Sequence, residues 1–161
     1  MNTNLKKITY TSLLIALVFL CTVVIIIPSP LGGYINLGDA AIYLASYFLG
    51  PMLGFLAGGI GPMLGDFYLG YVHYMIGTLF IKGTMGLVSG YLFQRDKYVL
   101  GSISGLMIMV VGYYGFEVIL FHNLLSPLAN VPYNLVQGII GAIVGVVVIK
   151  MLKKAGVKVS L

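Results

Sequence analysis

The residues that could do chemistry in this sequence are charged side chains within apolar stretches. Three of them interrupt one such stretch, 34–82: Asp39, Asp66 and Lys82. An ammonium group near the middle of a membrane span costs about 2.5–3.5 kcal/mol, so Lys82 is expected to face a partner or a water-filled cavity. It forms either a structural ion pair with Asp66 or Glu117, or an anchor for a polar or anionic group of a ligand. The two roles can coexist if ligand binding rearranges the pair.

Aromatic and amide side chains in the second half of the chain add to this candidate set. Tyr113 and Glu117 are four residues apart, so they share one face of a helix. Asn134 and Gln137 share a face at the spacing i, i+3. Rings stack on a heteroaromatic ligand and amides read its donors and acceptors, so these residues predict a site for a small ring. The alternative is an aromatic belt, because tyrosine is enriched at bilayer interfaces.

The expected ligand contacts are eight polar or aromatic residues: Lys82, Glu117, Asn134, Gln137, Tyr113, Asp66, His122 and Asn36. No catalytic residue, cofactor or metal is expected. His73 and His122 are far apart and lack a second pair at metal-ligand spacing. The segment 77–84 has the order Lys-Gly-Thr and lies inside an apolar run, so it is no ATPase phosphate loop. A membrane enzyme that uses Asp39 and Asp66 stays open as an alternative.

Composition decides which solvent surrounds these residues. Hydrophobic residues make up 60% of the sequence and charged residues 8%, with a mean hydropathy of +1.05. A soluble domain carries about 25% charged residues, so we predict an all-α integral membrane protein with 1–161 as a single transmembrane domain. The net charge is +5. The basic residues lie between or beyond the apolar runs, which is typical of membrane topology and not of a nucleic-acid-binding face.

The apolar runs predict a bundle of six transmembrane helices: 8–27, 40–49, 51–69, 74–93, 99–121 and 133–152. Pro28 and Pro30 end the first helix. Asp39 is placed to cap the N-terminus of the second helix, which is short for a full span. Gly50 and Pro51 break the chain before the third helix, whose first turn suits a proline.

Six spans place both termini on the same side of the membrane. The basic residues of the N-terminus, of the loop 94–97 and of the C-terminal tail fall on that side, and the positive-inside rule makes it cytoplasmic. Asp39 and Asp66 then lie near the outer rim, whereas Lys82 lies about 12 Å along its helix. The sequence therefore predicts a multi-pass protein of the cell membrane whose ligand site faces the extracellular side.

Glycines at regular spacing predict where helices pack closely. Three pairs have small-xxx-small spacing: Gly54 and Gly58, Gly86 and Gly90, Gly141 and Gly145. Such faces let membrane helices approach each other, because close backbone contact replaces the hydrophobic effect there. Ser12 and Ala16 form a smaller version in the first helix, which serves either an internal contact or a partner helix.

Four segments together resemble a known family: Asn36–Asp39, Gly50–Asp66, Ile81–Gly90 and Asn134–Gly145. They are similar to the substrate-binding S components of energy-coupling factor (ECF) vitamin transporters, and the likeness covers nearly the whole chain. The resemblance implies a six-helix membrane protein that captures a vitamin or its precursor from outside, without being an enzyme. It also implies docking on a transmembrane T component with two ATP-binding cassette ATPases.

The resemblance also implies where ligand and partner bind. The ligand is expected near the outer surface, lined by the last three helices and the outer loops, with the loop after the first helix as a lid. Ser12 and Ala16 occupy the place of the small residues that meet the T component. The branch resembled takes riboflavin, hydroxymethylpyrimidine and pyridoxine-like substrates. A modest set of polar residues and short outer loops favour hydroxymethylpyrimidine or a pyridoxine-like ring, with riboflavin or a purely structural assembly subunit as alternatives.

Overall fold

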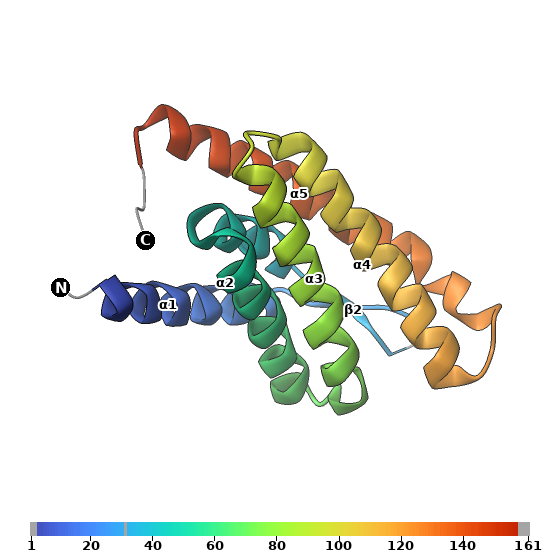
Figure 1. The fold of residues 1–161 in the computed structure, drawn as a ribbon. Coiled ribbons are helices and arrows are strands. Elements are labelled where there is room, and N and C mark those ends of the chain that lie inside the picture. The colour runs from blue at the N-terminus through green and yellow to red at the C-terminus, as the bar shows by residue number, and fades with distance from the viewer. Residues whose placement is uncertain (1–2, 31, 158–161) are drawn as a thin grey trace.

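A computed structural model of the protein describes residues 3–30 and 32–157, and these are almost entirely helical (Figure 1). The long helices are α1 (Thr3–Val23), α2 (Gly38–Leu69), α3 (Met75–Phe93), α4 (Tyr98–Phe121) and α5 (Val131–Lys154). The short strands β1 (Ile27–Pro28) and β2 (Tyr34–Ile35) form an antiparallel hairpin. The 3-10 helices η1 (Val72–Tyr74) and η2 (Ser126–Ala129) precede α3 and α5. Within the described residues, five helices are long and apolar enough to cross a membrane.

Helix α2 is broken near its middle. Gly50 has φ 74° and ψ −171°, a conformation that is not helical and that glycine adopts without steric cost. The break divides α2 into two arms, 38–49 and 51–69, and Pro51 begins the second. Two separate helices were predicted for this segment, 40–49 and 51–69, and the structure has one element broken at the same place. The first arm is about 18 Å long at 1.5 Å per residue, which is shorter than the apolar core of a bilayer.

The first helix differs from its predicted bounds. It was expected to cover 8–27, but α1 begins at Thr3, ends at Val23, and Ile27 already belongs to strand β1. The residue before a proline avoids the helical region, so Ile27 is extended before Pro28. The preceding isoleucines are β-branched and suit an extended chain equally well.

The second arm of α2 and helix α3 pack backbone to backbone. A methyl group on Gly86 would lie closer than 3.0 Å to the carbonyl oxygen of Gly54, and one on Gly58 would lie 2.8 Å from that of Lys82. Glycine is therefore needed on both sides of this seam, as the small-xxx-small spacing predicted. The seam fixes the height of Lys82 relative to the second arm of α2.

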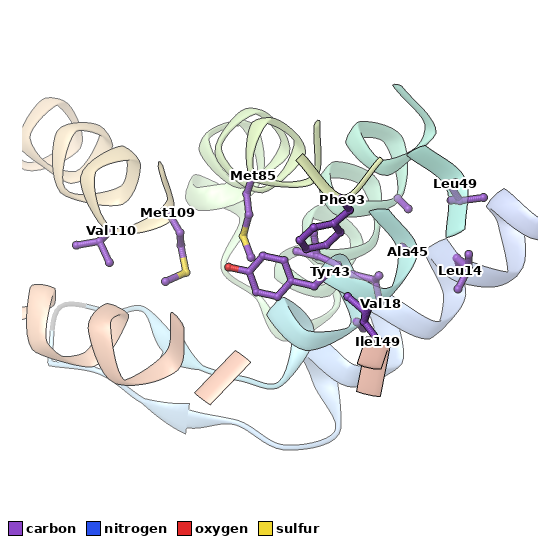
Figure 2. Close-up of a cluster of buried hydrophobic side chains, with 13 residues drawn as sticks. Leu14, Val18, Tyr43, Ala45, Leu49, Met85, Phe93, Met109, Val110 and Ile149 are labelled. Atoms are coloured by element: carbon purple, nitrogen blue, oxygen red, sulfur yellow. The ribbon is translucent and has the colours of Figure 1, made fainter. Parts of the chain in front are cut away.

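The first arm of α2 packs on glycines of α5, and its Tyr43 side chain reaches α4. A methyl group on Gly141 would lie 2.5 Å from the Cβ of Asp39, and one on Gly145 would lie 2.9 Å from the ring of Tyr43. Tyr43 is fully buried in the hydrophobic core (Figure 2), and its hydroxyl donates to the carbonyl oxygen of Ser102 at 2.7 Å. These contacts hold the start of α2 deep in the bundle.

The two ends of the bundle have different chemistry. At one end, the break at Gly50 lies beside Gln94, and Asp96 forms an ion pair of 2.6 Å with Lys153. Hydrogen bonds from Lys153 and Tyr98 hold the pKa of Asp96 below its usual range. The start of α1 and the end of α5 lie toward this end in Figure 1, whereas the hairpin, η1 and η2 lie toward the opposite one.

Candidate functional site

A polar cavity lies at the hairpin end, walled by the hairpin, the second arm of α2, η1, α3, α4 and α5. Seven of the eight predicted ligand contacts line it: Lys82, Glu117, Asn134, Gln137, Tyr113, Asp66 and Asn36. The volume of the cavity is about 30 Å³, measured with a water-sized probe. Because about 10–15 Å³ on this measure holds one water, an aromatic ring fits only if the lining side chains or the hairpin move.

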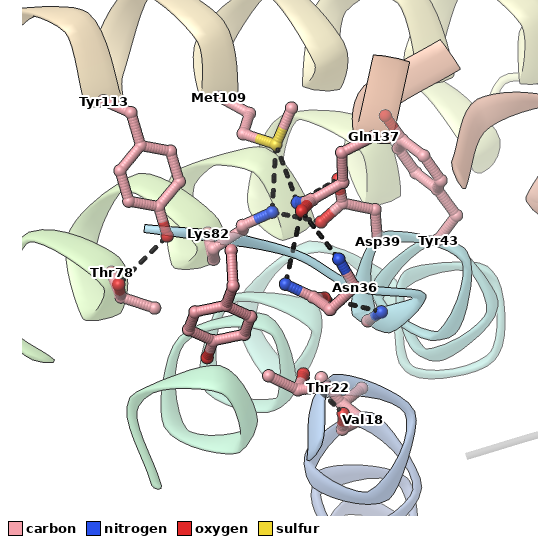
Figure 3. Close-up of polar contacts among 12 residues, drawn as sticks. Val18, Thr22, Asn36, Asp39, Tyr43, Thr78, Lys82, Met109, Tyr113 and Gln137 are labelled. Carbon is pink, nitrogen blue, oxygen red and sulfur yellow. Dashed lines mark hydrogen bonds and ion pairs between the residues drawn. The ribbon is translucent and has the colours of Figure 1, made fainter. Parts of the chain in front are cut away.

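A buried ion pair lies beside this cavity. The Nζ atom of Lys82 contacts the Oδ1 atom of Asp39, and the two side chains are 3% and 0% exposed (Figure 3). The predicted partners of Lys82, Asp66 and Glu117, were wrong. Asp39 was also expected at the outer rim as a helix cap, but its carboxylate points into the bundle, where Gly141 leaves room for its Cβ. The side chain that accepts from the start of α2 is that of Asn36, whose Oδ1 binds the Gly38 N–H at 2.8 Å.

Gln137 joins this ion pair to the hairpin. Its Nε2 donates to the Oδ2 atom of Asp39 at 3.1 Å and to the sulfur of Met109 at 3.4 Å. Its Oε1 accepts the backbone N–H of Asn36 at 2.9 Å (Figure 3). Lys82 also donates to the sulfur of Met109, at 3.0 Å. Both oxygens of Asp39 and both ends of the Gln137 amide are thus occupied.

Glu117 forms a second polar group, closer to the start of α5. Its Oε1 accepts from the Tyr74 hydroxyl at 3.1 Å and from the Asn130 side-chain amide at 2.9 Å. Its Oε2 is buried and has no hydrogen-bond partner among the described residues. Asn134, one turn into α5, also lines the cavity.

Asp66 fastens the hairpin on the other side. Its Oδ1 accepts from the Tyr34 hydroxyl at 2.7 Å, while its Oδ2 is buried without a partner in the described part of the chain. The Tyr34 ring packs on that of Tyr71 with the centroids 4.8 Å apart. Burial and the neighbouring Asp66 raise the pKa of Tyr34 well above its usual value, so the hydroxyl keeps its proton and donates. The hairpin is therefore held at two points, by Asp66 and by Gln137.

Tyr34→Phe is expected to release the hairpin at one of these points. Hydrogen bonds to charged groups contribute about 1.5–3 kcal/mol, so hydrogen–deuterium exchange of the peptide 27–36 should become at least about tenfold faster. Tyr71→Phe is the matched control, because it removes a neighbouring tyrosine hydroxyl and keeps the ring that packs on Tyr34. Equal exchange in wild type and Tyr34→Phe would show that this bond does not hold the hairpin.

Several positions were missed or lie elsewhere than predicted. Tyr34, Thr78 and Asn130 line the cavity, and none was predicted. Thr78 precedes Lys82 by four residues and Asn130 precedes Asn134 by four, so helical spacing could have indicated both. Tyr34 lies in the hairpin and has no such signal. The Thr78 hydroxyl bonds that of Tyr113 at 2.9 Å and so joins α3 to α4. His122 does not line the cavity: it is exposed, has φ 49°, and ends α4 in the left-handed conformation.

The arrangement suits reversible binding of a small polar ring. Tyrosine rings, amides, one ammonium group and two carboxylates converge on one enclosed space. Within residues 3–30 and 32–157, no group of three or more His, Cys, Asp or Glu side chains is placed to hold a metal ion. Hydrogen bonds from neighbouring side chains hold Asp66, Glu117 and Gln137 in place.

Comparisons with known proteins agree with this architecture. The family model described as "ECF-type riboflavin transporter, S component" matches residues 2–154. A Pyrococcus woesei protein described as "Uncharacterized protein in gap 3'region" is 34% identical over 129 residues, covering 77% of this chain and 86% of that protein. The thiamine precursor transporter HmpT of Lactococcus lactis subsp. cremoris is 29% identical over 158 residues, covering 97% and 93%.

A solved structure shares the fold. The S component for biotin from an ECF-type ABC transporter superposes with a TM-score of 0.60 at 23% sequence identity. The match covers 96% of this chain and 95% of that one. At this identity the likeness shows a common arrangement of helices and leaves the ligand open.

Proposed function

The chain belongs to the family of ECF-type riboflavin transporter S components, and from this membership we propose that it captures a small heteroaromatic vitamin or precursor for an ATP-driven importer. The observation that carries the proposal is the enclosed polar cavity at the hairpin end, lined by aromatic rings, amides and charged groups. Members of this family bind the substrate of a transporter and are not enzymes. The family therefore gives no support to the membrane-enzyme alternative.

The proposed ligand is a single substituted ring of the hydroxymethylpyrimidine or pyridoxine type. The relative HmpT is by its name a thiamine precursor transporter, which supports the pyrimidine. The small free space of about 30 Å³ supports one ring over the three fused rings of riboflavin, because a larger ligand must displace more of the hairpin. Riboflavin stays the second candidate because the family description names it.

The proposed ligand contacts are the seven predicted residues that line the cavity. Lys82, Gln137 and Asn36 belong to the group around the ion pair, and Glu117 and Asn134 also line the cavity. Asp66 and Tyr113 complete the lining. His122, which was predicted as a supporting contact, is left out of the proposed set because it is exposed outside the cavity.

The proposed topology has six membrane-crossing segments and both termini in the cytoplasm. It counts the two arms of α2 as separate segments that meet at Gly50. The basic residues of the loop 94–97 lie at the same end of the bundle as Lys153, which supports a cytoplasmic location for that end. The cavity at the opposite end then faces the extracellular side.

We expect the partners to be a transmembrane T component and two ATP-binding cassette ATPases. An apolar groove between α1 and the second arm of α2 supports this, because Ser12 and Ala16 lie in it together with Phe19, Leu64 and Phe67. Ser12 and Ala16 are both exposed. Of the two roles predicted for these small residues, exposure favours contact with a partner helix.

Ala16→Phe is expected to block assembly with the T component while leaving ligand binding unchanged. A phenyl ring would fill the groove and prevent a helix from approaching closely. The matched control is Leu13→Phe, since Leu13 is exposed on the same helix but does not line the groove. The measurement is co-purification of the T component with each variant. Retention of the T component by Ala16→Phe would place the docking face elsewhere.

Identification of the ligand tests the proposed function directly. The full chain is purified in detergent, and mass spectrometry of the released small molecules is followed by calorimetry with hydroxymethylpyrimidine, pyridoxine and riboflavin. Binding without ATP is expected, because ATP hydrolysis belongs to the proposed partners. If no vitamin-sized heterocycle binds, the structural-subunit alternative is favoured.

Glu117→Gln is expected to weaken binding of this ligand at least about tenfold. The substitution keeps the size of the side chain but removes a negative charge and turns an acceptor into a donor, and charge-assisted hydrogen bonds contribute about 1.5–3 kcal/mol. The measurement is the Kd from calorimetry. Unchanged affinity would take Glu117 out of the proposed site.

A further inference from the structure

The charges around the cavity are unequal. Among the described residues, the lining holds one basic side chain, Lys82, and two acidic ones, Asp66 and Glu117. Lys82 is already paired with Asp39, which lies behind it. His73 is close enough to interact with Asp66 electrostatically, but it is exposed and does not line the cavity. Lys82 also interacts electrostatically with Asp66, but its charge is shared with Asp39. The cavity wall therefore holds more negative than positive charge.

Both acids also keep an unused acceptor. The Oδ2 atom of Asp66 and the Oε2 atom of Glu117 are buried and have no hydrogen-bond partner among the described residues. The two residues are only 3% and 2% exposed. Buried acceptors of this kind are rare, because leaving them unpaired is costly. Two in one cavity point to a ligand that brings its own donors.

The other oxygen of each acid is already held in place. Tyr34 donates to Asp66, while Tyr74 and Asn130 donate to Glu117. These bonds fix the carboxylates, so the free oxygens are oriented before a ligand arrives. Such preorganisation increases discrimination, because an analogue that lacks a donor cannot be accommodated by turning the carboxylate away.

Lys82 has a more limited role in this arrangement. An ammonium group has three N–H donors, and the contacts with Asp39 and Met109 use two of them. One N–H donor remains, and the positive charge of the ammonium group is already compensated by Asp39. Lys82 can therefore bind a neutral acceptor such as a ring nitrogen, but it does not provide the uncompensated positive charge that an anionic ligand needs.

We propose that the cavity selects a heteroaromatic ring that bears amino or cationic N–H donors, and that it rejects analogues with acceptor or anionic groups in their place. Asp66 and Glu117 receive the donors, and Lys82 binds a ring acceptor. The inference rests on the proposed function and narrows its ligand class. The Tyr34, Tyr74 and Tyr113 rings also line the cavity and suit a ring with positive charge, since aromatic faces attract cations.

Two matched pairs of probes test the selection on the purified full chain. The first is 4-amino-5-hydroxymethyl-2-methylpyrimidine with its 4-oxo counterpart, and the second is pyridoxamine with 4-pyridoxic acid. In each pair that binds, the amino member should have a Kd at least about a hundredfold lower, as expected for a site built to pair a donor. A 4-oxo or acid member that binds as tightly as its amino partner overturns the inference and leaves the proposed function intact. Absence of binding by all four contradicts the proposed single-ring ligand and this inference with it.

Variants assign the selection to particular oxygens. In Asp66→Asn or Glu117→Gln, an amide group replaces one acceptor by a donor, so the ratio of the two Kd values should fall at least about tenfold in one of them. Asp96→Asn is the matched control: it makes the same change at the opposite end, and asparagine accepts the φ of 58° found there. An unchanged ratio in both site variants, each monodisperse in size-exclusion chromatography, overturns the assignment. If either fails to fold, the probe pairs on the wild-type chain still decide.

Discussion

Lys82→Ala is expected to lower the free energy of unfolding by about 3–5 kcal/mol, because removal of one partner leaves a buried charge uncompensated. The charge left behind is that of Asp39, whose side chain is fully buried. Ligand affinity should fall as well, because Lys82 lines the cavity. The measurement is thermal unfolding of the purified chain in detergent, followed by calorimetry with the ligand.

A double variant separates the charge effect from the loss of side-chain volume. Asp39→Asn combined with Lys82→Met removes both charges and keeps similar shapes, and such replacements of buried ion pairs are often neutral or stabilising. It should therefore recover most of the stability that Lys82→Ala loses, without recovering ligand binding. Equal stability of Lys82→Ala and wild type would mean that Asp39 and Lys82 are not a buried pair.

Gly86→Ala is expected to destabilise the bundle by about 1–3 kcal/mol, the typical cost of overpacking a tight contact. The added methyl group would collide with the carbonyl oxygen of Gly54, which is backbone and cannot rotate away. The second arm of α2 and helix α3 would have to separate, and Asp66 and Lys82 would move apart with them. Loss of ligand affinity is expected to accompany the loss of stability, both measured as for Lys82→Ala.

Gly115→Ala is the matched control for this substitution. A methyl group on Gly115 has no atom within 4 Å, and the residue lies within helix α4. Alanine is favoured over glycine inside a helix by about 1 kcal/mol, so the variant should be as stable as wild type or slightly more stable. If Gly86→Ala behaved like Gly115→Ala, the two helices would not be in backbone contact.

Much of the fold was predictable because membrane helices can be recognised in a sequence by their length and hydropathy. The break at Gly50 was also predictable, since a glycine followed by a proline interrupts a helix in a recognisable way. The end of α1 was not predicted, because the run up to Ile27 is apolar throughout and hydropathy does not distinguish its helical part from the strand. Two helices were predicted where α2 is one broken element, since a sequence pattern cannot set the angle at the break.

The residues that line the cavity were easier to predict than the hydrogen bonds and ion pairs between them. Glu117, Asn134 and Gln137, which line the cavity, were predicted because amides and acids on shared helix faces are rare in an apolar sequence. The partner of Lys82 was not found, because it depends on how far α2 rotates and how closely α5 approaches it. Gly141 allows α5 to approach α2 closely, because it leaves room for the Cβ of Asp39. The side chains of the hairpin follow no helical period, so Tyr34 could be located only in three dimensions. Asn130 precedes Asn134 by four residues at the start of α5, and this spacing could have indicated it.

The two-sided amide of Gln137 has a thermodynamic consequence for ligand capture. Its oxygen accepts the backbone N–H of Asn36 and its nitrogen donates to the carboxylate of Asp39, so one side chain links the hairpin to the ion pair. Movement of the hairpin away from α5 would break the bond between Asn36 and Gln137. The amide would then be free to turn, and Asp39 would lose a donor. By reciprocity, any ligand that loosens the ion pair also favours the open hairpin to the same extent in free energy. Opening of the hairpin and reorganisation of the buried charges would therefore be one coupled equilibrium.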